Sequence, residues 1–250
     1  MIYHYTSIET LSKILKSKKI RFKRLDLVDD PDEYIELEGI SIAPFVFVSC
    51  WTRQKEENMP QWIIYGDHRH GVRIGMNENI FNIHEETTPM CTDKGYELVK
   101  AYSLIKHTES IQPLYFKDKK ILKDICYVDD VQRYKSECIQ FDGTHILVNP
   151  DKFDIYKSRD WQFQKECRFT FFAHPRLKDI LPEFSRDLFE NNHLEQASID
   201  VELLDKVYNT MEIKLGPDVT EAEILAVQGL MNKYLNRSDY TKSKFPPRQE

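Results

Sequence analysis

The order of apolar and polar residues predicts a strand followed directly by a helix at the start of the chain. The opening Tyr-His-Tyr-Thr segment has strand length, with His4 and Thr6 on one side and the tyrosines on the other. Apolar residues then recur at helical spacing, and Thr6 and Glu9 have the spacing of a capping box. His4 is therefore predicted to lie at a rigid junction between a strand and a helix, where it can hold a ligand.

Similar patterns predict the remaining elements. Further strands are expected at 20–25, 44–51, 71–76, 125–128, 164–172 and 207–215, and helices at 32–38, 56–65, 94–106, 130–138 and 220–235. The segment 44–51 is almost wholly apolar, which is typical of a central strand covered on both faces. Because no repeat or low-complexity linker is present, the sequence favours one mixed α+β domain over residues 1–235 with a helical insertion. A flexible tail is expected at 236–250.

Composition narrows the class of protein. The chain has 250 residues, of which 41% are hydrophobic, enough for an ordinary buried core. Its net charge of −6 argues against a protein that coats nucleic acid through bulk electrostatics. No apolar run reaches the length of a membrane span, and the first residues lack the features of a secretory signal, so a cytoplasmic protein without membrane contact is expected. Five scattered cysteines without a CxxC pair predict free thiols and no structural zinc: Cys50, Cys91, Cys126, Cys138 and Cys167.

The first block with residues suited to chemistry covers positions 59–71. Its simpler interpretation is a helix that buries Trp62 and Tyr65 and ends in a polar turn. Its functional interpretation is an aromatic surface on which a flat ring stacks, with His68 and Arg69 near an anionic group. The two closely spaced histidines of this block lack a clear third ligand, so no metal site is predicted.

The second block covers positions 157–168. Glu166 and Arg168 share one face of the predicted strand, where an exposed ion pair would contribute little to stability. Alternatively, a carboxylate at the start of this strand, beneath an aromatic residue such as Trp161, could stabilise a developing positive charge. Spacing alone favours neither interpretation.

Other chemistries have weaker signals. The chain contains no GxGxxG, GxxxxGK[ST] or GxSxG motif, so no dinucleotide fold of that type, P-loop or serine-hydrolase elbow is indicated. An acidic run could assemble a metal-dependent nuclease centre from Asp29, Asp30, Asp32 and Glu33. Such a run more often caps and solvates a turn, and we favour that interpretation.

Together, the opening strand, the acidic turn and the two blocks resemble the motifs of a bacterial and phage family known as domain of unknown function family 2971. The resemblance spans residues 3 to about 230 and departs from the family pattern at the displaced Met59 and at Gln164. The matching positions are Tyr3, His4, Tyr5, Thr6, Ser7, Asp29, Asp30, Pro31, Asp32, Glu33, Ser49, Cys50, Trp62, Tyr65, Gly71, Lys157, Trp161, Glu166, Arg168 and Ile213 to Gly216.

That family is similar to the ADP-ribosyltransferase superfamily, which implies a split mixed and antiparallel sheet that binds NAD as a substrate. The resemblance implies that Glu166 is the catalytic carboxylate and that His4 binds the adenosine ribose. It also implies that Tyr65 stacks on the nicotinamide ring, with Trp62 as the competing candidate. The implied NAD-binding set is His4, Tyr5, Thr6, Ser49, Trp62 and Tyr65, and the implied acceptor-orienting set is Gln164, Trp161 and Arg168.

The expected function is transfer of ADP-ribose from NAD to an unknown protein or nucleic-acid acceptor, without a metal, in phage defence, a toxin–antitoxin system or stress response. Gln164 replaces a second carboxylate that the family often has, and its amide can orient an acceptor without deprotonating it. Water therefore stays open as the acceptor, which would make the protein an NAD glycohydrolase. Non-catalytic binding of a nucleotide or partner, and nuclease activity, are the remaining alternatives.

Overall fold

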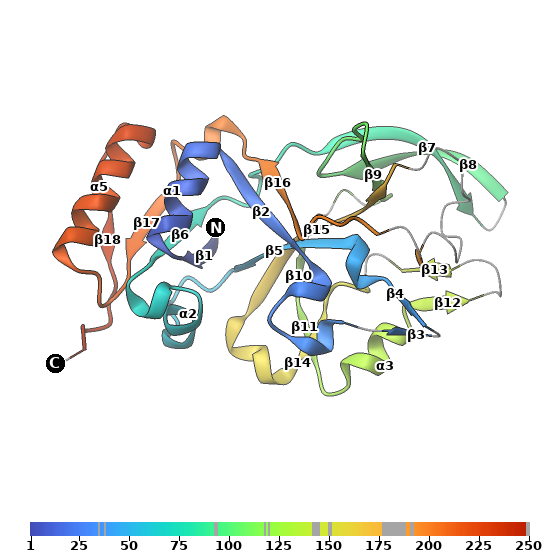
Figure 1. Ribbon diagram of the computed structural model, residues 1–250, viewed down its shortest axis with the longest axis horizontal. Coiled ribbons are helices and arrows are strands. Elements are labelled where there is room, and N and C mark those ends of the chain that lie inside the picture. Colours follow the sequence, from blue (N-terminus) through green and yellow to red (C-terminus); the bar gives the residue numbers. More distant parts are fainter. Residues whose placement is uncertain are drawn as a thin grey trace.

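The fold is α+β and is built around one large mixed sheet with few helices (Figure 1). The computed structural model describes residues 1–34, 36–37, 39–92, 95–117, 119, 121–141, 146–149, 152–176, 189–190 and 193–248. Along the sheet the order is β10 (Leu122–Asp124), β15 (Glu166–Pro175), β5 (Val46–Thr52), β1 (Ile2–Thr6), β6 (Val72–Met76), β17 (Glu212–Leu215) and β18 (Thr241–Lys242). Off this path, β2 (Lys19–Arg24) pairs with β5 and β16 (Ser198–Glu202), and β9 (Ile111–Leu114) pairs with β15.

The sheet opens between β1 and β5. Strand β1 pairs with β6 at five positions, but its register with β5 consists of the single pair Tyr3 and Thr52. Strand β15 occupies the opposite edge of β5 over its full length, and β2 reaches the same edge as β1 only at Phe47 and Val48. On that edge, residues 49–51 of β5 therefore pair with neither β1 nor β2. A gap opens there between β1 and β2.

Helix α1 (Ile8–Ser17) connects the two strands that border this gap. Its N-cap is Ser7, whose hydroxyl accepts a hydrogen bond from the backbone N–H of Thr10, so the predicted capping box of Thr6 and Glu9 is wrong. The reason is that β1 extends through Thr6 to pair with Val72, which moves the helix start one residue along. The polar N-cap and the paired strand hold His4 in a fixed position, as expected.

Helix α5 (Glu221–Leu235) lies beside α1 at one end of the molecule (Figure 1). It begins with a complete capping box between Thr220 and Glu223, and it buries Val227 and Met231. The helix predicted over 220–235 is therefore confirmed almost residue for residue. Together α1 and α5 cover the left part of the sheet as drawn, and they close the main apolar core.

The other elements are short. Two further helices are α2 (Met59–Ile64) and α3 (Val131–Ser136). The small strands are β3 (Glu36–Leu37) with β4 (Ile40–Ser41), β7 (His84–Thr92) with β8 (Gly95–Ser103), β11 (Cys126–Val128) with β14 (Tyr156–Ser158), and β12 (Ile139–Phe141) with β13 (Ile146–Val148). Short 3₁₀ helices lie at η1 (Leu25–Leu27), η2 (Pro31–Glu33), η3 (Ala43–Phe45), η4 (Asp67–Arg69), η5 (Arg159–Gln164) and η6 (Asp205–Val207).

Three of the elements expected from the sequence differ in the structure. The helix predicted over 94–106 is replaced by β8, which forms a long hairpin with β7, and residue 94 lies outside the described residues. The acidic helix over 32–38 is a 3₁₀ turn followed by β3, and the strand over 207–215 begins only at Glu212. The expected helical insertion is therefore mostly strand, because pairing across the hairpin outweighs weak local helix preference.

The alternation of β15 is confirmed. Cys167, Phe169 and Phe171 point into the main apolar core, and Phe171 stacks on Phe47 of β5 with ring centroids 5.3 Å apart. Glu166 and Arg168 therefore point to the opposite face of the sheet. That face carries charged side chains beside a second, smaller apolar cluster around Phe45 and Phe153.

The segment after α5 pairs with the sheet at β18 and contacts neighbouring loops as far as Arg248, in contrast to the flexible tail predicted for 236–250. Strand β18 runs parallel to β17, and the Ser243 hydroxyl and the Lys244 backbone N–H both donate hydrogen bonds to Glu57. Glu57 is buried in the loop that leads into α2 and accepts a further hydrogen bond from Trp62 Nε1 at 3.2 Å. The C-terminal segment thus supports the loop on which α2 begins.

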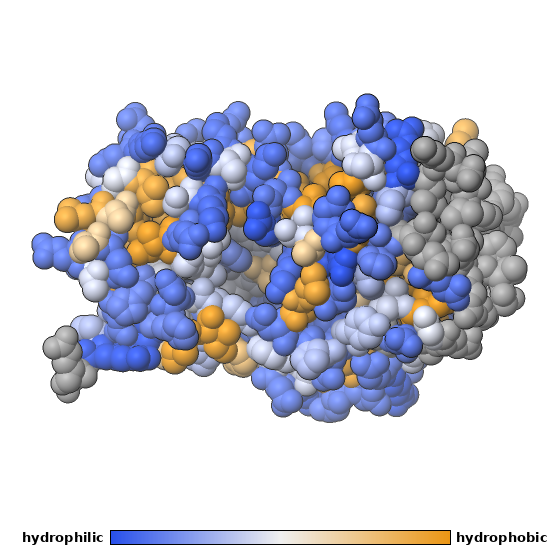
Figure 2. Space-filling view, in the orientation of Figure 1, coloured by the Kyte–Doolittle hydropathy of each residue, from blue (hydrophilic) through white to orange (hydrophobic). Residues whose placement is uncertain are grey.

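Most of the face drawn in Figure 2 is hydrophilic, with apolar areas over α2 and α5. The exposed apolar side chains of these helices include Ile64, which is 50% exposed, and Leu225, which is 63% exposed. Among the described residues, none of the helices combines the length and apolar character needed to span a bilayer.

We expect the contact between Ser243 and Glu57 to stabilise the fold measurably. Ser243→Ala removes a hydrogen bond to a buried carboxylate, which lowers the free energy of unfolding by about 2 kcal/mol. That loss lowers the melting temperature by roughly 4–8 °C in a scanning calorimeter. Thr241→Ala, at an exposed position of β18 two residues before Ser243, is the matched control and should leave the melting temperature nearly unchanged.

Candidate functional site

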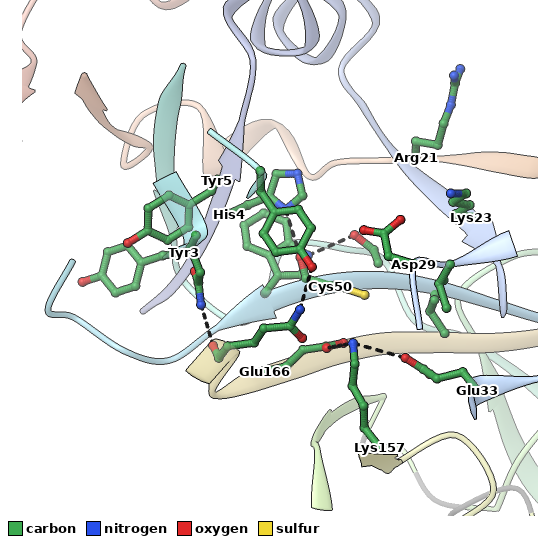
Figure 3. Close-up of a pocket in the computed structure, with 17 residues that line it drawn as sticks. Tyr3, His4, Tyr5, Arg21, Lys23, Asp29, Glu33, Cys50, Lys157 and Glu166 are labelled. Carbon is green, nitrogen blue, oxygen red and sulfur yellow. Dashed lines mark hydrogen bonds and ion pairs between the residues drawn. The ribbon is translucent and has the colours of Figure 1, made fainter. Parts of the chain in front are cut away.

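A cavity of about 230 Å³ lies where β1 and β5 separate (Figure 3). The exposed edge of β5 forms its floor, β1 and α2 border one side, and the ends of β2 and β15 border the others. Its lining residues are Tyr3, His4, Tyr5, Arg21, Lys23, Val28, Asp29, Glu33, Val48, Ser49, Cys50, Trp51, Gln61, Tyr65, Lys157, Gln164 and Glu166. The three residues proposed as a catalytic set, His4, Tyr65 and Glu166, all line this one cavity.

His4 is held by the free edge of β5. Its Nδ1 lies 2.9 Å from the Cys50 carbonyl oxygen, which only accepts hydrogen bonds, so Nδ1 carries the proton and Nε2 is left as an acceptor. The ring also packs against Trp51, with centroids 5.1 Å apart. Burial lowers the pKa of His4 below its usual value and outweighs the opposing hydrogen bond to Cys50. The imidazole is therefore neutral at pH 7 and offers a lone pair to a ligand hydroxyl.

Tyr65 and Gln164 face each other across the cavity wall. Tyr65 ends α2, and its hydroxyl oxygen accepts a hydrogen bond of 2.6 Å from Gln164 Nε2. Burial raises the pKa of Tyr65, so the phenol stays protonated and keeps its own hydrogen to donate. Gln164 is buried, and its Oε1 has no hydrogen-bond partner among the described residues. One donor and one acceptor therefore remain for a ligand.

Glu166 is the first residue of β15 and is tightly bound from both sides. Arg168 Nη2 lies 2.6 Å from one carboxylate oxygen, and Lys157 Nζ lies 3.0 Å from the other. The Glu166 backbone N–H donates to the Tyr127 hydroxyl at 2.8 Å. These contacts fix the orientation of the carboxylate at the edge of the cavity, and they place two cations beside it.

Glu33 shares the same two cations from the opposite side. Its carboxylate accepts hydrogen bonds from Arg168 and lies 3.2 Å from Lys157 Nζ, and its carbonyl accepts a bond of 2.8 Å from Lys135 Nζ. Complete burial would raise the pKa of Glu33, but attraction to Arg168 and Lys157 outweighs it and lowers the pKa to about 2. Burial conversely lowers the pKa of Lys135 to about 8.

The acidic run does not form a metal centre in the part of the chain that the structure describes. Glu33 points into the ion-pair cluster, the Asp30 carboxylate caps η2, and Asp29 and Asp32 are exposed. Groups of three or more potential His, Cys, Asp or Glu metal ligands are absent from those residues. The interpretation of the run as a turn is the better one, although Glu33 itself is buried rather than solvated.

Several predicted site residues lie away from the cavity. Trp62 is fully buried and meets Tyr5 edge-on, with ring centroids 4.8 Å apart, so it cannot stack on a ligand. Thr6 and Arg168 are buried outside the lining. Trp161 is also absent from the lining and contacts Lys157, whose Nζ is 5.1 Å from its ring centroid. Of the predicted set, the cavity brings together His4, Tyr5, Ser49, Tyr65, Gln164 and Glu166.

The anion-binding role considered for the turn after α2 is not supported by its contacts. Arg69 pairs with Asp218 at 3.0 Å and donates to the Pro246 carbonyl, and neither Arg69 nor His68 lines the cavity. At the rim of the cavity, positive charge comes instead from β2. Arg21 and Lys23 are exposed at its rim, on the same side of the strand, although Arg21 also pairs with Asp200 at 2.8 Å.

Besides Arg21 and Lys23 at the rim, sequence reasoning missed two inner lining residues with a clear chemical role, Lys157 and Glu33. Both occur in the motifs, but nothing in their spacing shows that residues 33, 157 and 166 meet. The one signal available was the closeness of Lys157, Glu166 and Arg168 within a single block, which is compatible with an ion-pair cluster, whereas Glu33 lies in a separate motif.

The ionisation of Glu33 makes stability depend on pH. Because its pKa is about 2 in the folded protein and near 4.5 when unfolded, ionisation stabilises the fold above about pH 5, on the order of 3 kcal/mol. This contribution is lost as the pH falls from 4.5 towards 2. Glu33→Gln should therefore be less stable than wild type at pH 7, and the difference should shrink towards pH 2–3 in urea titrations. A constant difference across this range would contradict the ion-pair assignment.

Comparison of the chain with protein-family models, with curated proteins and with solved structures finds no match. The family resemblance of the short motifs accordingly stays an expectation. The function of the cavity is inferred from the residues that line it.

Proposed function

We propose that the protein binds NAD in the cavity between β1 and β5 and cleaves the bond between nicotinamide and ribose. The observation that carries this proposal is the convergence of three residues that are far apart in the sequence. His4, Tyr65 and Glu166 come from β1, the end of α2 and the start of β15, and all three line the same cavity. The expected ADP-ribosyltransferase arrangement requires this convergence, and it also requires the gap in the sheet that the single pair Tyr3 and Thr52 leaves.

The chemistry of the proposed reaction matches a fixed carboxylate. As the bond breaks, its electron pair leaves with the nicotinamide nitrogen, and the ribose gains oxocarbenium character, as in glycoside cleavage. Glu166 stabilises that positive charge and accepts a hydrogen bond from a ribose hydroxyl. An acceptor then forms the new bond to the ribose carbon and loses its proton. A carboxylate that is already oriented needs little rearrangement during this step.

The other polar groups would hold NAD in a reactive shape. The free Nε2 of His4 accepts a hydrogen bond from a ribose hydroxyl, and the Tyr65 ring provides a surface for nicotinamide. Arg21 and Lys23 at the rim place positive charge where a diphosphate can lie.

Gln164 supports transfer to an acceptor that carries N–H groups. Its buried Oε1 lacks a partner among the described residues and can accept a hydrogen bond from an amide, a guanidinium or a base. Both a protein and a nucleic acid present such groups. If water is the acceptor instead, the product is free ADP-ribose.

A second candidate function is NAD or nucleotide binding without chemistry. The observation that favours it is the pair of cations on Glu166, because Lys157 and Arg168 oppose the positive charge that the reaction develops. Tight NAD binding with no nicotinamide release would support this alternative.

Glu166→Gln should nearly abolish turnover. The variant keeps the size of the side chain and one acceptor oxygen but removes its charge, so nicotinamide release from NAD falls by about a hundredfold or more. Release is measured by mass spectrometry, with circular dichroism to verify folding. Glu202→Gln, an exposed carboxylate on β16, is the matched control. Unchanged NAD consumption by Glu166→Gln would refute the catalytic assignment.

Tyr65 should act mainly in binding. Tyr65→Ala removes the ring surface and raises the KM for NAD by roughly tenfold, whereas Tyr65→Phe keeps the ring and most of the affinity. Initial rates over a range of NAD concentrations distinguish the two variants. Equal KM values for Tyr65→Ala and wild type would show that the ring does not contact the substrate.

A further inference from the structure

Four buried charged groups form a closed ring at the inner wall of the cavity. Each carboxylate contacts each cation: Lys157 Nζ lies 3.2 Å from Glu33 and 3.0 Å from Glu166, and Arg168 Nη2 lies 3.0 Å from Glu33 and 2.6 Å from Glu166. All four side chains are less than one-tenth exposed. With two charges of each sign, the ring is neutral as a whole.

The four residues come from three separate parts of the chain. Glu166 and Arg168 are neighbours on one face of β15, Lys157 lies in β14, and Glu33 ends the acidic turn η2. Behind the ring, Lys135 donates to the Glu33 carbonyl, and the Asp154 carbonyl accepts from Arg168. Glu33, Lys157 and Glu166 line the cavity, whereas Arg168 lies behind them.

Glu33 reduces the net positive charge that Lys157 and Arg168 exert on Glu166. Without it, Lys157 and Arg168 would both act on one carboxylate, and the wall of the cavity would carry a net positive charge. In a buried site such a charge acts strongly at short range and would oppose a cationic transition state. With Glu33 present, each cation is shared between two carboxylates, as the four distances show.

We propose that Glu33 is a positioning residue of the reaction: it shares Lys157 and Arg168 with Glu166 and so preserves negative charge on Glu166 towards the reacting ribose. This inference rests on the proposed NAD-cleaving function. It gives the acidic turn a role in catalysis that requires no contact with substrate and no metal ion.

A charge-balance cycle tests the proposal, using wild type, Glu33→Gln and the double variant Glu33→Gln with Lys157→Met. Glu33→Gln leaves an extra positive charge, so kcat for nicotinamide release falls by at least about tenfold. The KM for NAD stays within about twofold, because His4, Tyr65 and the rim are unchanged. The double variant is neutral again, with Glu166 and Arg168 as the remaining pair, and recovers at least about a third of the wild-type kcat.

A purely structural role for Glu33 predicts a different result. In that case the double variant, which has lost two buried groups, is no more active than Glu33→Gln, and this outcome in folded protein overturns the proposal. Melting temperatures establish folding for each variant. If Glu33→Gln does not fold, the double variant decides alone: kcat within about fivefold of wild type supports the proposal, and a folded double variant with a hundredfold loss refutes it.

The same experiment separates this inference from the proposed function. If wild type releases no nicotinamide from NAD, the proposed function is wrong and the role of Glu33 falls with it. If wild type is active, Glu166→Gln is inactive and the double variant does not recover, only the inference about Glu33 is wrong.

Discussion

The site depends on one constraint, which is that β1 and β5 meet at a single pair of residues, Tyr3 and Thr52. Past this pair the strands separate, and the backbone edge of β5 needs other partners because buried carbonyl and N–H groups are costly when left without them. His4 supplies one of these partners through its bond to the Cys50 carbonyl. The same bond fixes the imidazole tautomer and aims its free nitrogen into the opening. The gap between the strands and the orientation of the His4 side chain therefore have a common origin.

The opposite wall of the cavity is organised by charge rather than by strand pairing. Arg168 is fully buried, so it requires carboxylates, and it obtains one from its own strand and one from the turn at Glu33. Lys157 completes the set from β14. A turn near the N-terminus, a short strand and a central strand are thereby fastened together at the cavity. The stability of the fold and the electrostatics of the site cannot be changed independently here.

The sequence predicted elements well where the pattern is local and strong, as for α5, the strand β5 and the alternating faces of β15. The sequence also led to His4, Tyr65 and Glu166 as members of one site, but only through the family resemblance. It failed for the β7–β8 hairpin, because that pairing is decided across the hairpin and not within one segment. It could not choose between Trp62 and Tyr65, since helical spacing does not say which aromatic ring faces a cavity. It did not place Glu33 beside Lys157, because an ion-pair ring that joins distant residues leaves no periodic pattern in the sequence.

The contacts of Glu57 have a consequence for the order in which the molecule is completed. The loop that leads to α2 and Tyr65 is fastened by Ser243 and Lys244, almost two hundred residues later in the chain. During synthesis, β1, β5 and β15 are all made before this fastening can form. The loop that leads to Tyr65 therefore depends on residues that are synthesised almost last. A truncation before Ser243 would remove this support from the wall that carries Tyr65 and leave every member of the charge ring in the chain.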